Sequence, residues 1–201
     1  MLRCLKDTDG VVGLTLSQIG LFLATGILLT VVFSLVFSSD WQRTAELQSI
    51  ASSFSNLLGN IDNRFFEQTT QFQFPKKDYT YTVKISMEYI VIASKGSWDA
   101  DLSVSERLLI RPWPRFSQPN WTTGEDLHSY LNKTCGHRGT KNDSLPAVNF
   151  TQLCNEQNST ISYFAAHPLE IIMREPVFLE KVSIYSEEAK KQDFLLIYQL
   201  S

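Results

Sequence analysis

The most constraining feature of this chain is an apolar run near its N-terminus. Residues 11–37 contain no Asp, Glu, Lys or Arg. A helix of this length rises ~1.5 Å per residue, so it is about 40 Å long and exceeds the ~30 Å hydrocarbon core of a bilayer. The run therefore predicts a transmembrane helix at 11–37, with membrane lipid as its immediate partner.

The charges beside the run predict its orientation. Arg3 and Lys6 precede it, and Arg43 is the first basic residue after it. Because basic residues tend to stay on the cytoplasmic side of a membrane, residues 1–10 are expected to form a cytoplasmic leader. We predict a single-pass protein of the cell membrane with an extracellular C-terminal domain.

A cleaved secretory signal is the alternative. The apolar region of such a signal usually has about 7 to 15 residues and is followed by a cleavage site with small residues. This run is longer, although Val36, Phe37 and Ser38 form an acceptable cleavage site. On this alternative the mature protein begins near Ser39.

Five Asn-x-Ser/Thr triplets between residues 120 and 160 favour an extracellular location. Such triplets are glycan acceptors on accessible loops of exported proteins. The predicted glycosylation sites are Asn120, Asn132, Asn142, Asn149 and Asn158. The alternative is a polar loop that happens to be rich in Asn, Ser and Thr.

The cysteines fit the same topology. Cys135 and Cys154 lie in the segment that carries the triplets, whereas Cys4 lies in the predicted leader. A disulfide between Cys135 and Cys154 would close a loop worth about 3 kcal/mol in the chain-entropy model. We predict this disulfide, and two unpaired thiols are the alternative where oxidant is scarce.

An amphipathic helix is predicted at 38–62, after the apolar run. Ser38, Ser39 and Asp40 offer oxygens that can cap a helix. Apolar residues then recur every three or four positions, which is the helical period. They are Leu47, Ile50, Phe54, Leu57 or Leu58, and Ile61. The helix either continues the membrane helix or restarts after a bend at the two serines.

From residue 79 the apolar pattern changes to a period of two, which is typical of β-strands. Residues 79–93 and 98–110 alternate in this way around a turn at 95–97, and they predict a long β-hairpin that ends at Pro112. A second hairpin is predicted from 177–185 and 194–200. Its last strand is apolar on both faces, as expected of a central or helix-covered strand.

These elements predict an α+β fold. The N-terminal transmembrane helix continues into the amphipathic helix, and an antiparallel β-sheet ectodomain follows at 63–201. Residues 115–160 are polar and weakly periodic. We expect them to form a glycosylated surface excursion, ordered by the disulfide, the glycans or short helices around 126–131.

The sequence carries no motif of an enzyme or a metal centre. HExxH, CxxC, GxSxG and glycine-rich phosphate loops are missing around His128, His137 and His167, the only histidines. The net charge of -3 does not favour a nucleic-acid partner. Aromatic residues such as Trp113 and Trp121 could stack on sugars or proteins, although strand aromatics are more often core. We expect a protein that is not an enzyme and that uses no cofactor, metal or nucleic acid.

The start of the chain has a further pattern. Residues 6–10 form a short charged leader, Lys-Asp-Thr-Asp-Gly, and Val-Val-Gly-Leu at 11–14 opens the apolar helix. Over residues 6–60 this pattern resembles archaeal type IV pilin-like proteins, although Asp9 stands where the family usually has a basic residue. In that family a membrane peptidase cuts before the apolar run, and the freed helices pack into a filament core with β-rich heads outside.

The resemblance implies a processing junction between Gly10 and Val11. It also implies self-association, or association with other pilin-like subunits, through the N-terminal helix. The function expected from the sequence is therefore that of a membrane-anchored cell-surface protein with a structural or adhesive role, of which a pilin-like subunit is one form. The alternative is an extracellular ligand- or partner-binding module anchored to the membrane.

Overall fold

The computed structural model describes residues 8–96, 99–116 and 120–200. Most of the predicted leader, including Arg3, Cys4 and Lys6, lies outside these residues, as do 97–98 near the predicted first turn. The chain forms two compact units, Met1–Arg43 and Thr44–Ser201, which are described separately. The helices are α1 (Thr8–Asp62), α2 (Gly124–Cys135) and α3 (Ala147–Ala166).

The strands form two four-stranded sheets in the described residues. One has the order β1-β7-β8-β5, built from β1 (Gln68–Phe72), β7 (Val177–Tyr185), β8 (Lys191–Tyr198) and β5 (Trp113–Pro114). The other has the order β4-β3-β2-β6, built from β4 (Asp101–Arg107), β3 (Tyr89–Lys95), β2 (Tyr81–Ile85) and β6 (Leu169–Glu170). The structure thus confirms an α+β fold with largely antiparallel sheets, in which β5 pairs parallel to β8.

The amphipathic stripe of α1 packs as the sequence predicts. Helix α1 runs without interruption through Ser38 and Ser39, so the structure has a helix that continues there and does not restart. The stripe lies in the second half of α1, within the Thr44–Ser201 unit. Its members are fully or almost fully buried: Leu47, Ile50, Phe54, Leu58 and Ile61.

The first predicted strand is wrong in one respect. Residues 79–93 do not form one strand but two, β2 and β3, which turn back on each other at 86–88. The Ser86 hydroxyl accepts hydrogen bonds from the backbone N–H groups of Glu88 and Tyr89, at 3.1 and 3.0 Å. Met87 at the tip is buried. The alternation of apolar and polar residues therefore continues through the turn, which is why the period of two in the sequence did not reveal the turn.

The remaining strand predictions agree better with the structure. Strands β3 and β4 pair antiparallel from Tyr89 opposite Arg107, as the first predicted hairpin requires. Strands β7 and β8 form the second hairpin, with Tyr185 opposite Lys191. Strand β8 lies between β7 and β5. Its residues 194–198 are all buried, which confirms a central, covered strand.

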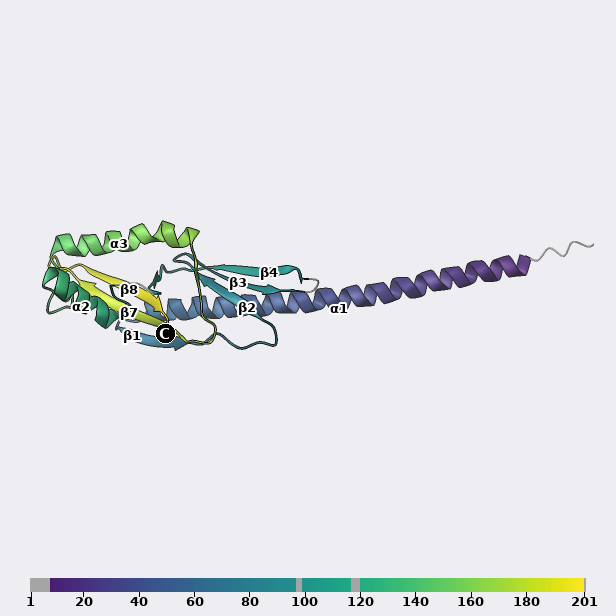
Figure 1. The fold of residues 1–201 in the computed structure, drawn as a ribbon, viewed down its shortest axis with the longest axis horizontal. Helices are drawn as coiled ribbons and strands as arrows, with labels where there is room; N and C mark the ends of the chain where they lie inside the picture. Colours follow the sequence, from purple (N-terminus) through teal and green to yellow (C-terminus); the bar gives the residue numbers. More distant parts are fainter. Residues whose placement is uncertain (1–7, 97–98, 117–119, 201) are drawn as a thin grey trace, which may run out of the picture. The chain divides into compact units, whose positions relative to one another are not determined.

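The sheet that contains β7 and β8 is covered on both faces (Figure 1). Leu179 and Ile197 belong to the apolar cluster that includes the buried stripe of α1 and strands of the other sheet. Their neighbours Val182 and Leu196 belong to a second cluster, with residues of α2 and α3. Because alternate side chains of a strand point to opposite faces, this sheet is the middle layer of the unit.

Two helices replace the weakly structured excursion expected at 115–160. Helix α2 includes the short helix expected around 126–131, whereas the 20-residue α3 was not predicted. The apolar residues that α3 buries are Phe150, Leu153 and Phe164. A polar stretch at 155–160, rich in Asn, Ser and Thr, interrupts their spacing. These residue types have low helix propensity, so local sequence favoured a loop and tertiary packing decided for a helix.

A buried lysine holds the end of α1 against the middle sheet. Lys181 on β7 is 4 % exposed and faces the α1 side. Its ammonium donates hydrogen bonds to the backbone oxygens of Asp62, at 2.5 Å, and Arg64, at 2.7 Å. It also pairs with the Asp193 carboxylate at 3.2 Å. Carbonyls at a helix C-terminus have no partner within the helix, and they carry partial negative charge, so a cation there both satisfies and stabilises them.

We expect the substitution Lys181→Met to lower the free energy of unfolding by about 2–4 kcal/mol, because it leaves the carbonyls of Asp62 and Arg64 without their charged donor and removes one of the two lysines that pair with Asp193. The matched control is Lys190→Met. Lys190 is 65 % exposed and pairs with Glu188 on the surface, so its loss should cost below about 1 kcal/mol. Denaturant titration of the full chain in detergent, followed by tryptophan fluorescence, measures both. Equal losses would contradict the role given to Lys181.

Candidate functional site

The apolar first part of α1 is the first candidate for a functional segment. Within the described residues, one helix is long and apolar enough, by length and composition, to cross a membrane. Its most apolar 18-residue window has a mean hydropathy of 2.5, and none of that window is buried within the protein. The hydroxyls of Thr25 and Thr30 donate to the carbonyls of Leu21 and Gly26, at 2.8 Å each. These polar groups are thus satisfied without water.

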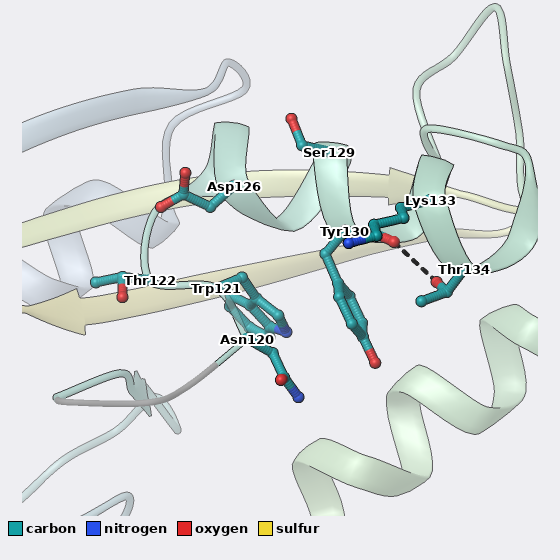
Figure 2. Close-up of a pocket in the computed structure, with 8 residues that line it drawn as sticks. All are labelled: Asn120, Trp121, Thr122, Asp126, Ser129, Tyr130, Lys133 and Thr134. Atoms are coloured by element: carbon teal, nitrogen blue, oxygen red, sulfur yellow. Dashed lines mark hydrogen bonds between the residues drawn. The ribbon is translucent and has the colours of Figure 1, made fainter.

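A hollow beside α2 is the second candidate, and it lies in the Thr44–Ser201 unit. Its volume is about 750 Å3, within the range of about 300–1,000 Å3 typical of small-molecule sites. Figure 2 shows the residues that line it: Asn120, Trp121, Thr122, Asp126, Ser129, Tyr130, Lys133 and Thr134. The first three come from the segment before α2, and the other five from α2 itself.

The helical period explains why one face of α2 lines the hollow. The lining residues at 126, 129, 130, 133 and 134 recur every three or four positions, whereas Leu127 and Leu131 are buried against the middle sheet. Residues spaced in this way share one side of a helix. The packing of the leucines therefore fixes which side chains face the hollow.

A capping box fixes the start of α2. The Thr123 hydroxyl accepts from the Asp126 backbone N–H, and the Asp126 carboxylate accepts from the Thr123 N–H, both at 3.1 Å. The hydrogen bond from the Thr123 backbone lowers the pKa of Asp126, so its carboxylate is charged at neutral pH. Gly124 is the first residue of α2. A Cβ atom there would lie 2.5 Å from Val182 Cγ2, so the close approach of α2 to β7 requires glycine.

Arg115 holds the segment before α2 in place. Its guanidinium lies 3.4 Å from the centre of the Trp121 ring, and its Nε and Nη2 donate to the Trp121 carbonyl at 3.2 and 2.8 Å. The Trp113 ring meets Trp121 edge-on at 5.0 Å. Burial lowers the pKa of Arg115 to about 10, against the opposing effect of Glu156, so the side chain remains charged at neutral pH.

Several polar groups in the hollow have no hydrogen-bond partner among the described residues. The side chains of Asn120, Ser129, Tyr130 and Lys133 make no hydrogen bond to another described residue. By contrast, the Thr134 hydroxyl donates to the Tyr130 carbonyl at 2.8 Å, as the dashed line in Figure 2 shows. The rings of Trp121 and Tyr130 point to the same side in that view. The hollow thus combines an aromatic wall with uncommitted donors and acceptors, meaning polar groups that make no hydrogen bond to another described residue.

The predicted glycosylation sites do not all lie on loops, which corrects the expectation from the sequence. Asn120 precedes α2 and Asn142 lies in a turn, whereas Asn132 is in α2, and Asn149 and Asn158 are in α3. The side chains of all except Asn149 are exposed. In the three helical triplets, the hydroxyls of Thr134, Thr151 and Thr160 donate to backbone carbonyls three or four residues before them. Whether any of the five carries a glycan stays a prediction.

The cysteines are brought to one region of the unit but are not bonded. Cys135 ends α2 and Cys154 lies in α3, and both pack against the same apolar cluster. Both are free thiols in the structure. Burial raises the pKa of the Cys154 thiol, which makes it a weaker nucleophile at neutral pH. The disulfide between them stays a prediction for oxidising conditions.

The three histidines have separate partners. His128 is buried, with Nδ1 2.6 Å from the Arg138 carbonyl, and His137 pairs with Asp143 at 2.9 Å. His167 stacks on Tyr163 at the end of α3. Within the described residues, no three His, Cys, Asp or Glu side chains are placed to hold a metal ion.

Comparison with known proteins gives no relative for this chain. No family model matches it, and neither do curated proteins or solved structures. The resemblance of the N-terminus to pilin-like proteins therefore stays a prediction from the sequence alone.

Sequence reasoning found part of the hollow. It marked Asn120 as a glycan acceptor and Trp121 as an aromatic residue that could stack on a ligand. It missed Arg115, Tyr130 and Lys133. The signal that could have found the last two is the pair Thr123 and Asp126, which is the spacing of a capping box, followed by Leu127 and Leu131.

We expect Arg115→Ala to lower the free energy of unfolding by about 2–4 kcal/mol, since the Trp121 carbonyl loses both donors and its ring loses a stacked cation. The tryptophan emission spectrum should also change. Arg111→Ala is the control, because Arg111 is 61 % exposed and pairs with Glu88 at the surface, at 3.3 Å. Denaturant titration measures the energies. An effect of Arg115→Ala no greater than that of Arg111→Ala would show that Arg115 does not position this segment.

Proposed function

We propose that this chain is a single-pass, membrane-anchored cell-surface protein with a structural or adhesive role. The observation that carries the proposal is the apolar part of α1, whose most apolar 18-residue window is not buried within the described residues and whose Thr25 and Thr30 hydroxyls are internally satisfied. A segment of this kind exposes a large apolar area, which is stable in lipid and unfavourable in water. The Thr44–Ser201 unit has its own buried core and is the part that the anchor displays.

A pilin-like subunit is the form of this role that we favour. One helix supplies both an apolar first half and, in its second half, core residues of a β-rich unit. This is the plan of the pilin-like family that the N-terminus resembles. In this form the first half of α1 mediates association with other copies or other pilin-like subunits, and the leader is removed between Gly10 and Val11.

A binding module on the same anchor is the second candidate. The hollow beside α2 favours it, because it places an aromatic side chain next to uncommitted polar groups. The two candidates share the anchor and the outward orientation of the Thr44–Ser201 unit. They differ in whether the first half of α1 or the hollow makes the functional contact.

We expect the double substitution Leu23→Arg and Ile27→Arg to release the protein from the membrane fraction. Each arginine at the centre of a spanning helix costs about 2.5–3.5 kcal/mol on insertion scales. The control is Leu23→Ile with Ile27→Leu, which keeps the apolar volume. Alkaline extraction of membranes, followed by blotting, measures the distribution. A wild-type protein that is itself extracted at high pH would contradict the anchor.

We expect the mature protein from its native cells to begin at Val11. Peptide mass spectrometry of the N-terminus measures this directly. A start at Met1 or Leu2 would contradict the pilin-like form but not the anchor, because the apolar segment would remain attached. A start near Ser39 would contradict both, since the apolar run would then be a removed secretory signal.

A further inference from the structure

The uncommitted groups in the hollow beside α2 differ in kind, and this limits what can bind there. The hollow offers an amide from Asn120, hydroxyls from Ser129 and Tyr130, and an ammonium from Lys133. Polar groups of this variety match a ligand that carries many hydroxyls, because each hydroxyl both donates and accepts a hydrogen bond.

The aromatic wall points to the same ligand class. Tyr130 is half-buried, so part of its ring is open to the hollow, whereas Trp121 is 3 % exposed and presents little surface. The face of an aromatic ring carries partial negative charge. The C–H bonds on one face of a pyranose carry partial positive charge, so a sugar ring stacks on such a face while its hydroxyls reach polar neighbours.

The charges of the lining disfavour a highly charged ligand. Lys133 and Asp126 are the charged residues that line the hollow, and they are opposite in sign. One oxygen of the Asp126 carboxylate already accepts from the Thr123 N–H. A polyphosphate would meet one lysine only, whereas a neutral sugar, or one with a single carboxylate, matches this balance.

Contacts within the unit hold α2 and Trp121 in place beside the hollow. The capping box and the buried leucines hold α2, and Arg115 holds Trp121 by two hydrogen bonds and a stacked contact. Binding sites that are ordered before the ligand arrives lose less conformational entropy on binding.

We propose that the hollow beside α2 is a saccharide-binding site, in which a pyranose ring stacks on Tyr130 and hydrogen-bonds to Asn120, Ser129 and Lys133. The proposal deepens the adhesive role proposed above by naming its ligand class. The sugar has two sources. It is either a saccharide on another molecule or the chain's own glycan, because Asn120 and Thr122, the acceptor and hydroxyl residues of one triplet, both line the hollow.

The first test measures binding of free sugars to the full chain in nanodiscs, made in a host that does not attach N-glycans. The probes are methyl α-mannopyranoside, N-acetylglucosamine and glucuronic acid, and saturation-transfer NMR measures binding. We expect at least one probe to bind with a millimolar Kd, and Tyr130→Leu to weaken it at least tenfold. Tyr163→Leu is the matched control, because Tyr163 is 60 % exposed on α3 and does not line the hollow; it should change the Kd less than twofold.

Two results would overturn the proposal. One is that none of the three probes gives a saturable signal, and the other is that Tyr130→Leu binds as well as the wild type. A second variant, Lys133→Gln, guards against misfolding of the first, because Lys133 is exposed and its substitution leaves the core intact. It should weaken binding of glucuronic acid more than binding of the neutral sugars.

The second test separates the two sources. Glycopeptide mass spectrometry of protein from the native cells shows whether Asn120 is modified. If it is, and the free sugars bind only after the glycan is removed, the site holds the chain's own glycan. If Asn120 is unmodified and the sugars bind, the site takes a saccharide from another molecule. Anchoring is measured separately by membrane extraction, so loss of sugar binding in a membrane-bound protein overturns the site and leaves the proposed anchor standing.

Discussion

The burial of one stripe of α1 is the interaction on which the Thr44–Ser201 unit depends. The stripe contacts strands of both sheets, so a single helix joins two sheets that share no strand. Phe54 at its middle packs with Phe72 and Phe74 from the segment that follows the helix. Full burial of each large apolar side chain stabilises the fold by about 1.5–3 kcal/mol, so removing this stripe would take away much of the apolar cluster that the two sheets share.

Lys181 determines where that helix ends relative to the middle sheet. A cation in a nearly dry position is unfavourable unless its donors are satisfied, and here two carbonyls at the end of α1 and the Asp193 carboxylate satisfy them. On the other face of the same strand, the Glu180 carboxylate accepts a hydrogen bond from the Gly124 N–H at the start of α2. Glu180 and Lys181 are adjacent residues whose side chains lie on opposite faces of β7, so this one strand positions a helix on each face of its sheet.

This arrangement separates the two proposed activities in the chain. In these proposals, the apolar first half of α1 would serve the anchor and contacts between subunits, and the hollow beside α2 would serve recognition. The hollow depends on the middle sheet, because α2 is held by its buried leucines and by Glu180. A structural subunit that also binds saccharide at its surface would be an adhesive protein, which joins the two functional candidates.

The sequence by itself determined the elements whose periodicity is uninterrupted: the apolar run, the stripe from Leu47 to Ile61, and the hairpin of β7 and β8. In the stripe and the hairpin, local pattern and burial agree, whereas the apolar run is defined by its length and lack of charge. Only the tertiary structure decided the turn at Met87, because a buried turn residue keeps the alternation of a strand. It alone also decided α3, since a polar stretch of low helix propensity interrupts the apolar spacing and packing overrides it. The hollow belongs to this second group. Arg115, Trp121 and Tyr130 are close in sequence, but their arrangement depends on the packing of α2 against β7 and β8, which come much later in the chain, and no local pattern encodes that packing.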